Sequence, residues 1–515
     1  MKKVFVSLLC FMLMHPAAHA QSDIPVNANN TWNGENTLAV NPLDSNNLVV
    51  AWMKVNLLTV SIAVSHSDDG GQTWSSPLLM PHVQSGNTAA DPTIIADDEG
   101  AFYLAYIDYN PQLTGGAVYV TKSTDGGETW SDPVEVINVN ASPDLPVDRP
   151  WIAIDQSNGI HHGRIYMVTK SYFASPPPHA VWLIYSDDDG ATWSTPVQVD
   201  SEWKVGLLLN SMGVPAVAAD GALYINYASW DLSKSFYPRN VITRSTDGGL
   251  TFSNYAIANV VANSLENDTI AQFSWCLSAN PADAGNLIAI WTDKISGDID
   301  IYYSISNDAG ITWNTAQRLN DDPVDNGIYQ DMCWSGFSKS GVYGALWRDR
   351  RDVDTGQWAA YKVYGVISED GGSTFSPNFS LASDSGNLFP GTAGNDFLGV
   401  ALYDATIYGT WTDSRTGSNQ LYFNRRDFSQ IISVPDLMQE ESSMHIYPQP
   451  AHDYFLLSGV PLPAIIQIAD LSGREMMSVR KTRITLTDIS QLNPGIYLMR
   501  VYTHNQVTSL KLVVE

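Results

Sequence analysis

Triplets of an aromatic residue, any residue and Asp recur along this chain at the ends of predicted β-strands. Arginines follow two of the triplets, at Arg350, Arg351 and Arg415. Arg binds a carboxylate or a sulfate through two parallel hydrogen bonds, and aromatic faces can stack on sugar rings. These residue types therefore predict a site for an anionic sugar. The triplets are Tyr106-Ile107-Asp108, Trp291-Thr292-Asp293, Trp347-Arg348-Asp349 and Trp411-Thr412-Asp413.

The substrate-binding candidates from this pattern are Asp91, Trp291, Asp293, Trp347, Asp349, Arg350, Trp411 and Asp413. The alternative is that the repeated Trp residues pack against neighbouring strands and that each Asp caps a turn. The clustered loop arginines have no evident role in a core, which favours a functional one.

Further charged residues fall where one predicted four-stranded unit crosses to the next. The catalytic candidates are Asp148, Arg149, Arg348 and Arg415. Glu202 and Glu266 are the only Glu residues that we place in such crossings. The crossing segments are Asp91-Pro92, Asp148-Arg149-Pro150-Trp151, Tyr329-Gln330-Asp331 and Asn395-Asp396.

A second chemistry would use a proton-moving His or Tyr beside an Arg. A polysaccharide lyase acting on uronate polymers needs an Arg to neutralise the carboxylate and a His or Tyr to move the proton. His179, Tyr237 and Arg239, with Tyr172, lie in two neighbouring predicted loops. His179 follows three prolines, so a rigid surface loop is the alternative interpretation.

One motif organises the chain that must position these groups. The pattern S-x-D-x-G-x-T-[WF] occurs six times, and its closing aromatics are 56, 63, 59, 61 and 62 residues apart. The Ser and Asp oxygens can accept backbone hydrogen bonds, the Gly supplies a positive φ, and the aromatic packs on a sheet. The motif therefore predicts a rigid turn with a structural Asp, at Asp69, Asp125, Asp188, Asp247, Asp308 and Asp370.

Four short predicted strands surround each turn. A four-stranded unit repeated about every 60 residues is typical of a β-propeller blade, because one small sheet cannot bury both of its faces alone. Counting second strands predicts seven blades, with six as the alternative, and the segment near Ile24–Ala28 as a closing strand. The second strands are Leu48–Trp52, Phe102–Tyr106, Ile165–Val168, Leu223–Tyr227, Leu287–Trp291, Val342–Trp347 and Ile407–Trp411.

The connectivity of such a blade separates two faces. If the Asp turn joins the third and fourth strands, the loops between the first and second strands share its face. The opposite face carries the loops between the second and third strands and the crossings between blades, where the candidates above lie.

Composition narrows the class of protein and of partner. The 515 residues hold 27 Lys plus Arg against 54 Asp plus Glu, a formal net charge of −27. This balance argues against nucleic acid and anionic lipid as partners, and a hydrophobic content of 44% excludes bulk disorder. Acidic loops such as Asp321-Asp322 leave calcium open, although no D-x-D-x-D-G loop is present, and no other cofactor is expected.

The first twenty residues resemble an export signal. Lys2 and Lys3 precede a short apolar run, and Ala18-His19-Ala20 forms an A-x-A cleavage site. No later stretch is long and apolar enough to suggest a transmembrane segment. The mature chain then keeps Cys276 and Cys333, which we interpret as buried small hydrophobes, with one bridge as the alternative.

The six-fold motif resembles the Asp-box, also called the BNR repeat. The segment from about residue 28 to 430 is similar to the sialidase-like Asp-box superfamily, in which the box occurs in sialidases, some endoglucanases and arabinanases, and receptors. The resemblance implies that the boxes lie away from the active site. A sialidase would further need three Arg residues, an Asp acid/base and a Tyr nucleophile with a Glu. Its first Arg motif is absent, since the mature chain has no Arg before Arg149.

A second resemblance covers the C-terminus. The Y-P-x-P-A element at Tyr447, the D-x-x-G-R element at Asp470 and the L-x-P-G-x-Y element at Leu492 are similar to the type IX secretion C-terminal sorting domain. Gln449 and Val514 depart from the usual pattern. The resemblance implies type IX machinery as a partner and a product that is secreted or held at the cell surface. The expected organisation is signal peptide 1–20, propeller 21–435, linker 436–445 and a small β-sandwich, 446–515.

Three functions remain open at this stage. A glycoside hydrolase predicts a carboxylate pair, or a Tyr with a Glu, beside Arg in one site. A lyase predicts a His or Tyr within reach of an Arg and no carboxylate pair. A non-catalytic glycan-binding or adhesion module predicts a shallow aromatic face without convergent acids.

Overall fold

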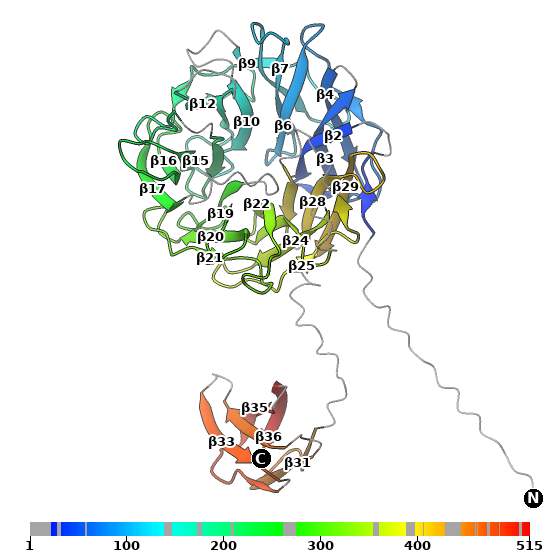
Figure 1. The fold of residues 1–515 in the computed structure, drawn as a ribbon, viewed down its shortest axis with the longest axis vertical. Coiled ribbons are helices and arrows are strands. Elements are labelled where there is room, and N and C mark those ends of the chain that lie inside the picture. The colour runs from blue at the N-terminus through cyan, green and yellow to red at the C-terminus, as the bar shows by residue number, and fades with distance from the viewer. Residues whose placement is uncertain are drawn as a thin grey trace, which may run out of the picture. The chain divides into compact units, whose positions relative to one another are not determined.

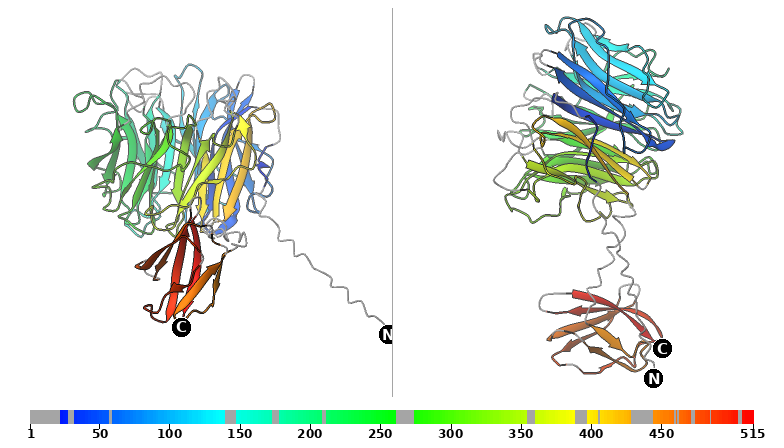
Figure 2. Two further views of the ribbon diagram at one scale, coloured as in Figure 1. Left: turned by 60° about the horizontal axis from the view of Figure 1, so that its bottom comes forward. Right: turned by 90° about the vertical axis from the view of Figure 1, so that its right-hand side faces the viewer.

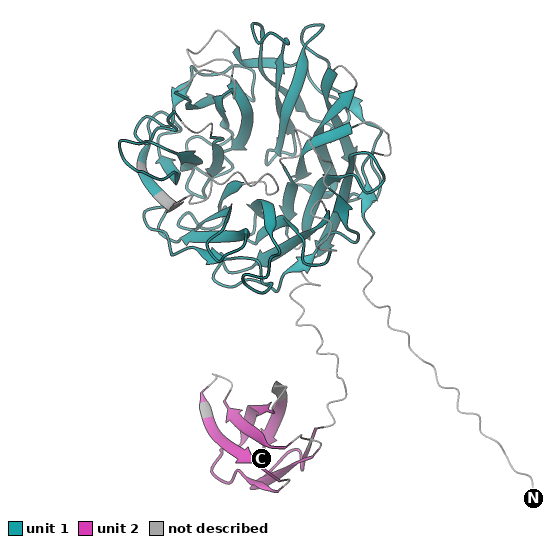
Figure 3. Ribbon diagram, in the orientation of Figure 1, with its two compact units in different colours: residues 1–431 teal, residues 432–515 magenta. Residues whose placement is uncertain are grey.

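A computed structural model of the chain separates into two compact units, residues 1–431 and residues 432–515 (Figure 3). The expected signal peptide and most of the expected linker lie outside the residues that the structure describes. Within the described residues the chain forms strands and turns but no helix, so none is present that could cross a membrane. The described residues are 22–27, 32–56, 59–138, 147–172, 178–207, 211–260, 274–353, 360–387, 397–404, 406–427, 444–458, 460, 462–470, 474–483, 485–503 and 507–515.

The described strands of the first unit form antiparallel sheets that follow one another along the chain. The first three sheets contain β2 (Trp32–Asn41), β3 (Asp44–Asn56), β4 (Thr59–Ser67) and β5 (Leu78–Leu79); β6 (Thr88–Ala96), β7 (Phe102–Tyr109), β8 (Gly116–Ser123) and β9 (Val134–Asn138); and β10 (Val147–Ile154), β11 (Ile165–Ser171), β12 (Val181–Ser186) and β13 (Val197–Gln198). The fourth and fifth contain β14 (Val214–Val217), β15 (Leu223–Ser229), β16 (Arg239–Ser245) and β17 (Ser253–Val260); and β18 (Trp275–Ala279), β19 (Leu287–Asp293), β20 (Asp300–Ser306) and β21 (Gln317–Arg318).

Two further sheets complete the series. The sixth contains β22 (Gln330–Phe337), β23 (Tyr343–Asp349), β24 (Ala360–Ser368), β25 (Phe379–Ser380) and β26 (Gly386–Asn387). The seventh contains β27 (Gly399–Tyr403), β28 (Thr406–Asp413), β29 (Gln420–Asp427) and, from the start of the chain, β1 (Ile24–Pro25).

The sheets form a closed ring (Figures 1 and 2). The first strand of each sheet contacts the first strand of the next, and β27 of the last sheet returns to β2 of the first. A separate apolar core lies between each neighbouring pair of sheets, including one between the last sheet and the first. Every residue of β7 is buried, because the second strand of a sheet lies between two such cores. The apolar runs that the sequence shows are therefore strands covered on both faces.

The N-terminal strand closes the ring, as expected for the segment near Ile24. Ile24 and Pro25 of β1 pair with Phe423 and Tyr422 of β29. Beside this pairing, the buried Asp23 carboxylate accepts a hydrogen bond from Arg415 Nη1 at 2.7 Å. These contacts join residues nearly 400 positions apart in the chain. Backbone pairing and an ion pair therefore both hold the ring closed.

The six Asp-box turns share one set of hydrogen bonds. In the first box, Ser67 Oγ donates to Asp69 Oδ1 at 2.8 Å, and Gly71 N–H donates to Ser67 Oγ at 2.9 Å. Thr73 donates to the Asp69 carboxylate from its backbone N–H at 2.8 Å and from its Oγ1 at 2.7 Å. The same Ser-to-Asp bond recurs at 2.8 Å in the other five boxes. The Asp residues thus organise their own turns, as the motif predicts.

The second unit contains two sheets that share one apolar core. The core brings together residues such as Phe455, Ile466 and Met499. One sheet contains β30 (His445–Tyr447), β31 (Tyr454–Ser458) and β34 (Thr487–Asp488); the other contains β33 (Glu475–Lys481), β32 (Ala464–Ala469), β35 (Gly495–Tyr502) and β36 (Val507–Val514).

Replacing an Asp-box carboxylate should weaken the fold without touching chemistry elsewhere. We expect Asp69→Ala to lower the melting temperature by about 1–3 °C, because three hydrogen bonds within the turn are lost. Thermal unfolding followed by circular dichroism measures this. Ile311→Ala, which removes a 66% exposed apolar side chain from the fifth Asp box, is the control and should melt within about 1 °C of the wild type, because surface changes cost about 0.5 kcal/mol or less.

Candidate functional site

Four first strands are interrupted at the same depth in the ring by a β-bulge. The register shifts at Gly34/Asn36, Ala90/Thr93, Asp148/Trp151 and Asp331/Trp334. One residue in each bulge has a positive φ, namely Glu35 (39°), Asp91 (53°), Arg149 (51°) and Met332 (52°). A non-glycine residue at positive φ is costly, and bulges commonly re-aim side chains near sites. Three of the four residues are ionisable, so the bulges direct charge to the end of the ring opposite the Asp boxes.

These bulges bring five ionisable side chains together. The carboxyl group of Asp91 is in hydrogen-bonding contact with those of Asp148 and Glu35. Lys170 Nζ donates to Asp148 Oδ2 at 3.0 Å, and Arg149 Nη2 lies 3.8 Å from Glu35 Oε1. All five side chains are largely buried, and the Arg149 side chain, at 22% exposure, is more accessible than those of Glu35, Asp148 and Lys170. We call Glu35, Asp91, Asp148, Arg149 and Lys170 the carboxyl cluster.

Burial, together with the neighbouring charge of Glu35, raises the pKa of Asp91 to about 7 against the opposing effect of Arg149. Burial, together with the charge of Asp91, likewise raises the pKa of Asp148 to about 7 against the opposing effect of Lys170. Because two buried carboxylates in contact repel each other, the pair retains a proton near neutral pH. The cluster therefore holds a proton donor and a proton acceptor side by side.

Tyr172 lies beside this pair, immediately after β11. Burial raises the pKa of its phenol, and the negative charges of Asp148 and Asp91 add to the shift. The phenol therefore keeps its proton at neutral pH. A carboxylate pair beside an Arg is one of the two combinations that the sequence predicts for a hydrolase, the other being a Tyr with a Glu.

An aromatic cluster supports the carboxyl cluster from within the ring. The Arg149 guanidinium lies over the Phe397 ring at 5.0 Å. Trp151 stacks on Trp334 with centroids 4.5 Å apart and meets Phe397 edge-on at 5.0 Å. Trp151 and Trp334 also line a cavity of about 810 Å³ in the centre of the ring, which extends to the loops of the Asp-box side. None of the five carboxyl-cluster residues lines that cavity.

The predicted Trp and Asp candidates are placed inside the sheets. Trp347 Nε1 donates to Asp349 Oδ2 at 3.0 Å, and Trp411 Nε1 donates to Asp413 Oδ2 at 3.1 Å. All four residues are essentially inaccessible, at 0–1% exposure. Arg351 and Arg415 in turn bind these two Asp carboxylates, at 2.9 Å and 2.6 Å. The contacts match the alternative that the sequence left open, in which Trp packs and Asp holds the following turn.

Trp291 and Asp293 follow the same pattern in the fifth sheet. Each is 2% exposed, Trp291 stacks on Tyr302 at 6.4 Å, and Asp293 Oδ1 accepts from the Lys294 backbone N–H at 2.8 Å. A Trp face covered by a Tyr ring offers no surface to a sugar, so these two residues also support the fold.

Arg348 and Arg350 share one buried carboxylate. Arg348 binds Asp331 through Nε and Nη2 at 2.7 Å and 2.6 Å, and Arg350 Nη1 binds it at 3.1 Å. The two arginines are 3% and 5% exposed. An inaccessible Arg that binds a buried carboxylate is held as an internal ion pair and is not presented to a solute.

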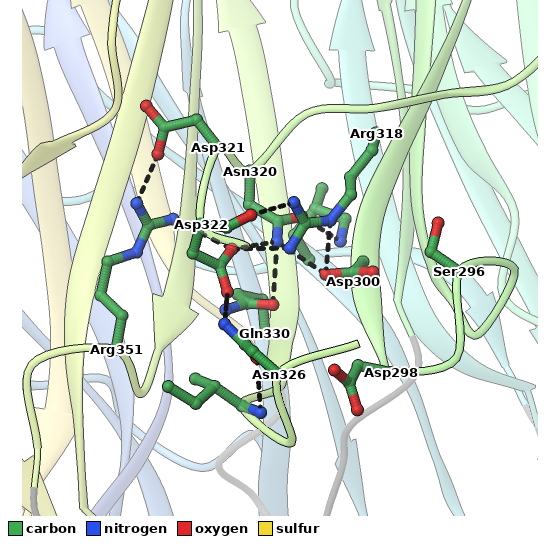
Figure 4. A network of polar contacts seen from close by, with 12 residues as sticks. Ser296, Asp298, Asp300, Arg318, Asn320, Asp321, Asp322, Asn326, Gln330 and Arg351 are labelled. Carbon is green, nitrogen blue, oxygen red and sulfur yellow. Dashed lines mark hydrogen bonds and ion pairs between the residues drawn. The ribbon is translucent and has the colours of Figure 1, made fainter. Parts of the chain in front are cut away.

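Arg351 joins a further polar network between the fifth and sixth sheets (Figure 4). Asn320 Nδ2 donates to Asp300, Asp322 and Gln330 at 2.7–2.9 Å. Arg318 adds ion pairs with Asp300 and Asp322 at 2.8 Å, so cations already neutralise this acidic loop region. Among the described residues, the one group whose His and acidic ligands could surround a metal ion is His66, Asp68 and Glu128, in and beside two Asp boxes.

The residues of the lyase interpretation lie in the third and fourth sheets. His179 makes an isolated bridge to Gly206, Tyr237 is 54% exposed in the loop before β16, and Arg239 begins β16. Glu202 is an exposed ion-pair partner of Lys234 at 3.6 Å. Glu266, Asn395 and Asp396 lie outside the described residues.

Glu35 and Lys170 are the cluster members that sequence reasoning missed. Glu35 precedes Thr37 by two residues, just as Asp91 precedes Thr93, and both threonines donate to a carbonyl oxygen of the next sheet. Aligning the first strands on that Thr would have placed Glu35 at the bulge. The sequence argument considered Glu residues only in the crossings between sheets. It therefore passed over Glu35, which lies inside β2.

Comparisons with known proteins agree with the two resemblances. The BNR repeat-like domain family matches residues 57–281, and the secretion system C-terminal sorting domain family matches residues 445–515. A sialidase of Bacteroides fragilis (strain YCH46) is 24% identical over 335 residues, which cover 59% of this chain and 58% of that protein. A sialidase of Micromonospora viridifaciens is 29% identical over 281 residues, 49% of this chain and 40% of that protein. The chain thus spans about half the length of these curated relatives.

Solved structures with a similar fold include two glycoside-acting proteins. A Hadza microbial sialidase is 16% identical, with a TM-score of 0.45 over 75% of this chain and 78% of that one. An α-L-arabinanase of Penicillium chrysogenum is 12% identical, with a TM-score of 0.44 over 80% of this chain and 99% of that one.

The raised pKa values make stability depend on pH. The folded pair retains its proton up to about pH 7, whereas an unfolded Asp loses it near pH 4, so the free energy of unfolding falls as the pH rises through that window. We expect Asp91→Asn to melt a few degrees higher than the wild type at pH 8 and at nearly the same temperature at pH 5. Calorimetry at both pH values measures this. The exposed Asp132→Asn should show no pH-dependent difference, and a constant offset for Asp91→Asn would contradict the buried pair.

Removing the Arg415 guanidinium, which binds Asp23 and Asp413 where the ring closes, should strongly lower the free energy of unfolding. Arg415→Gln leaves the buried carboxylates of Asp413 and Asp23 without their cation, which costs about 3–5 kcal/mol. Chemical denaturation gives the free energy of unfolding. The exposed Lys339→Gln, in the turn between β22 and β23, should change it by no more than about 0.5 kcal/mol. Equal losses in the two variants would show that Arg415 has no special role.

Proposed function

We propose that this chain, which carries a BNR repeat-like domain and a secretion system C-terminal sorting domain, is an exported glycoside hydrolase that acts at its carboxyl cluster. The single observation that carries the proposal is the buried Asp91–Asp148 pair beside Arg149, with the pKa values of both carboxyl groups raised to about 7. In this proposal the seven sheets are the blades of a propeller spanning residues 21–435, and residues 446–515 form a sandwich after a linker.

The chemistry assigns a role to each group. The protonated carboxyl of the Asp91–Asp148 pair donates its proton to the glycosidic oxygen as the bond to the anomeric carbon breaks. The water whose oxygen bonds to that carbon gives up a proton, and the pair, ionised by its own donation, takes one proton back, so one proton enters and one leaves. Arg149, the more accessible cation, binds a carboxylate or sulfate on the sugar through its guanidinium.

The geometry favours hydrolysis over the alternatives. A lyase would require a His or Tyr beside an Arg without paired carboxyl groups, and a binding module would not require titratable groups held near neutral pKa. The cluster contains the pair, the Arg and the neighbouring Tyr172. The sialidase relatives support a glycan as substrate, although the Arg triad of a sialidase is not matched by sequence.

The location follows from the two ends of the chain. The sorting domain points to type IX secretion, and with it to release or display at the cell surface. In this proposal the signal peptide of residues 1–20 is removed during export. A secreted enzyme would meet glycans outside the cell, in keeping with the strongly acidic net charge that disfavours nucleic acid.

The test is an activity screen of the mature chain, residues 21–515, against sialylated, sulfated and uronate-containing glycans. We expect new reducing ends without ultraviolet-absorbing product, and a rate that declines as the pH rises above about 7 and the pair loses its proton. Asp91→Asn should lower the rate by about 10²–10⁴-fold. Asp308→Asn, in an Asp box at the other end of the ring, should leave it unchanged.

The other functions give distinct results in the same screen. Unsaturated, absorbing product that disappears in His179→Ala would establish the lyase. Retention on one glycan with no product, unaffected by Asp91→Asn, would establish a binding module.

A further inference from the structure

Four large apolar side chains are exposed together on the loops of the third and fourth sheets. Phe236 is 87% exposed, Leu207 61%, Leu232 60% and Tyr237 54%. Single exposed hydrophobic residues are ordinary, but a group of them on neighbouring loops commonly marks a binding surface. We call these four residues the aromatic surface.

The loop that presents Phe236 and Tyr237 is held by its own hydrogen bonds. Ser235 Oγ donates to the Tyr237 carbonyl at 2.6 Å and accepts from the Tyr237 N–H at 3.1 Å. Trp230 Nε1 donates to the Phe236 carbonyl at 3.3 Å, and Ser235 N–H donates to the Asp231 carbonyl at 2.9 Å. These hydrogen bonds hold the loop in place while the two rings remain exposed, so the fold itself presents the rings to solvent.

A continuous set of contacts joins this surface to the carboxyl cluster. Asp148 pairs with Lys170 at the end of β11, and the next residue, Ser171, exchanges hydrogen bonds with Ala180. His179, beside Ala180, donates from its N–H to the Gly206 carbonyl at 3.2 Å.

Gly206 then abuts the loop of the aromatic surface. Gly206 has a φ of 93°, and a Cβ on it would lie 2.6 Å from the Trp230 carbonyl oxygen. Only glycine allows the two segments to pack this closely. Leu207 follows this contact directly, so the aromatic surface and the carboxyl cluster belong to adjoining loops on one end of the ring.

We propose that the aromatic surface binds further sugar residues of a glycan chain whose reacting end lies at the carboxyl cluster, so that the substrate is an extended glycan. This inference rests on the proposed function. Aromatic rings held open to solvent can stack on the apolar faces of sugars, and the Lys234–Glu202 pair at the edge offers hydrogen-bonding groups to hydroxyls. Lys234 lies over the Trp203 ring at 4.8 Å, which fixes that edge.

The observations favour a glycan over a lipid surface. A membrane-docking patch needs a surplus of basic residues, and the chain carries a net charge of −27. Near the aromatic surface, Lys234 is already paired with Glu202, and Asp231 adds a further acid.

The experiment compares polymeric and short substrates in the mature chain carrying Phe236→Ala and Tyr237→Ala. We expect KM for the polysaccharide cleaved in the screen to rise about tenfold, while kcat/KM for a p-nitrophenyl glycoside of the same sugar stays within about twofold. Ile160→Ala, which removes a 95% exposed side chain from the Asp-box end of the ring, is the matched control and should change neither value. Phe236→Tyr with Tyr237→Phe keeps both rings and should restore the wild-type KM.

Affinity electrophoresis separates this inference from the hydrolase proposal. The Asp91→Asn chain is run in gels that contain each polymer of the panel, with and without the two Ala substitutions. Loss of retardation on those substitutions supports the surface even if no polymer is ever cleaved. Cleavage with unchanged KM and unchanged retardation overturns the surface and leaves the hydrolase standing. An equal loss on the short glycoside, or binding to phosphatidylserine vesicles in place of glycan, also overturns the surface.

Discussion

The stacking of small sheets into a closed ring is the constraint on which the rest of the first unit depends. Each sheet of four or five strands is apolar on both faces and gains its cores only from the sheets before and after it. An open row would leave two apolar faces in water. The pairing of β1 with β29 and the Asp23–Arg415 ion pair remove those faces by joining the last sheet to the start of the chain. Each core needs the sheets on both of its sides, so opening the ring at its closure would destabilise the cores throughout the ring.

Ring closure also places the first strands around one centre, and this sets the location of the chemistry. Bulges at one depth turn Glu35, Asp91 and Arg149 toward each other, although they come from three different sheets. Positive φ at these residues is tolerated because the flanking pairs of each strand are held by the neighbouring second strand. The resulting burial raises the pKa of Asp91 and Asp148, so a strained backbone and a rigid ring together produce a proton-sharing pair.

The same end of the ring contains two kinds of charged residue that look alike in a sequence. Arg348 and Arg350 both bind the buried Asp331, Arg351 binds Asp349 and Arg415 binds Asp413, and these ion pairs fix strand ends and turns. Arg149 lies over the Phe397 ring, and its Nη2 is 3.8 Å from Glu35 Oε1. At 22% exposure its side chain is the most accessible of these five arginines, and accessibility separates a structural cation from one that can meet a substrate.

Features that depend on residues close together in the sequence could be predicted from the sequence alone. The eight residues of an Asp box contain the groups that form its turn, and apolar runs of strand length between the boxes indicate repeated sheets. The all-β class, the positions of the boxes and the closing strand near Ile24 could therefore be predicted. Asp91, Asp148 and Arg149 could also be placed at crossings facing one end. Only the tertiary structure decided that Trp347 and Trp411 are buried, that their Asp partners hold arginines, and that Glu35 completes the cluster. Burial and bulge geometry depend on contacts between residues distant in the chain, and a one-residue shift in a strand changes which side chains meet.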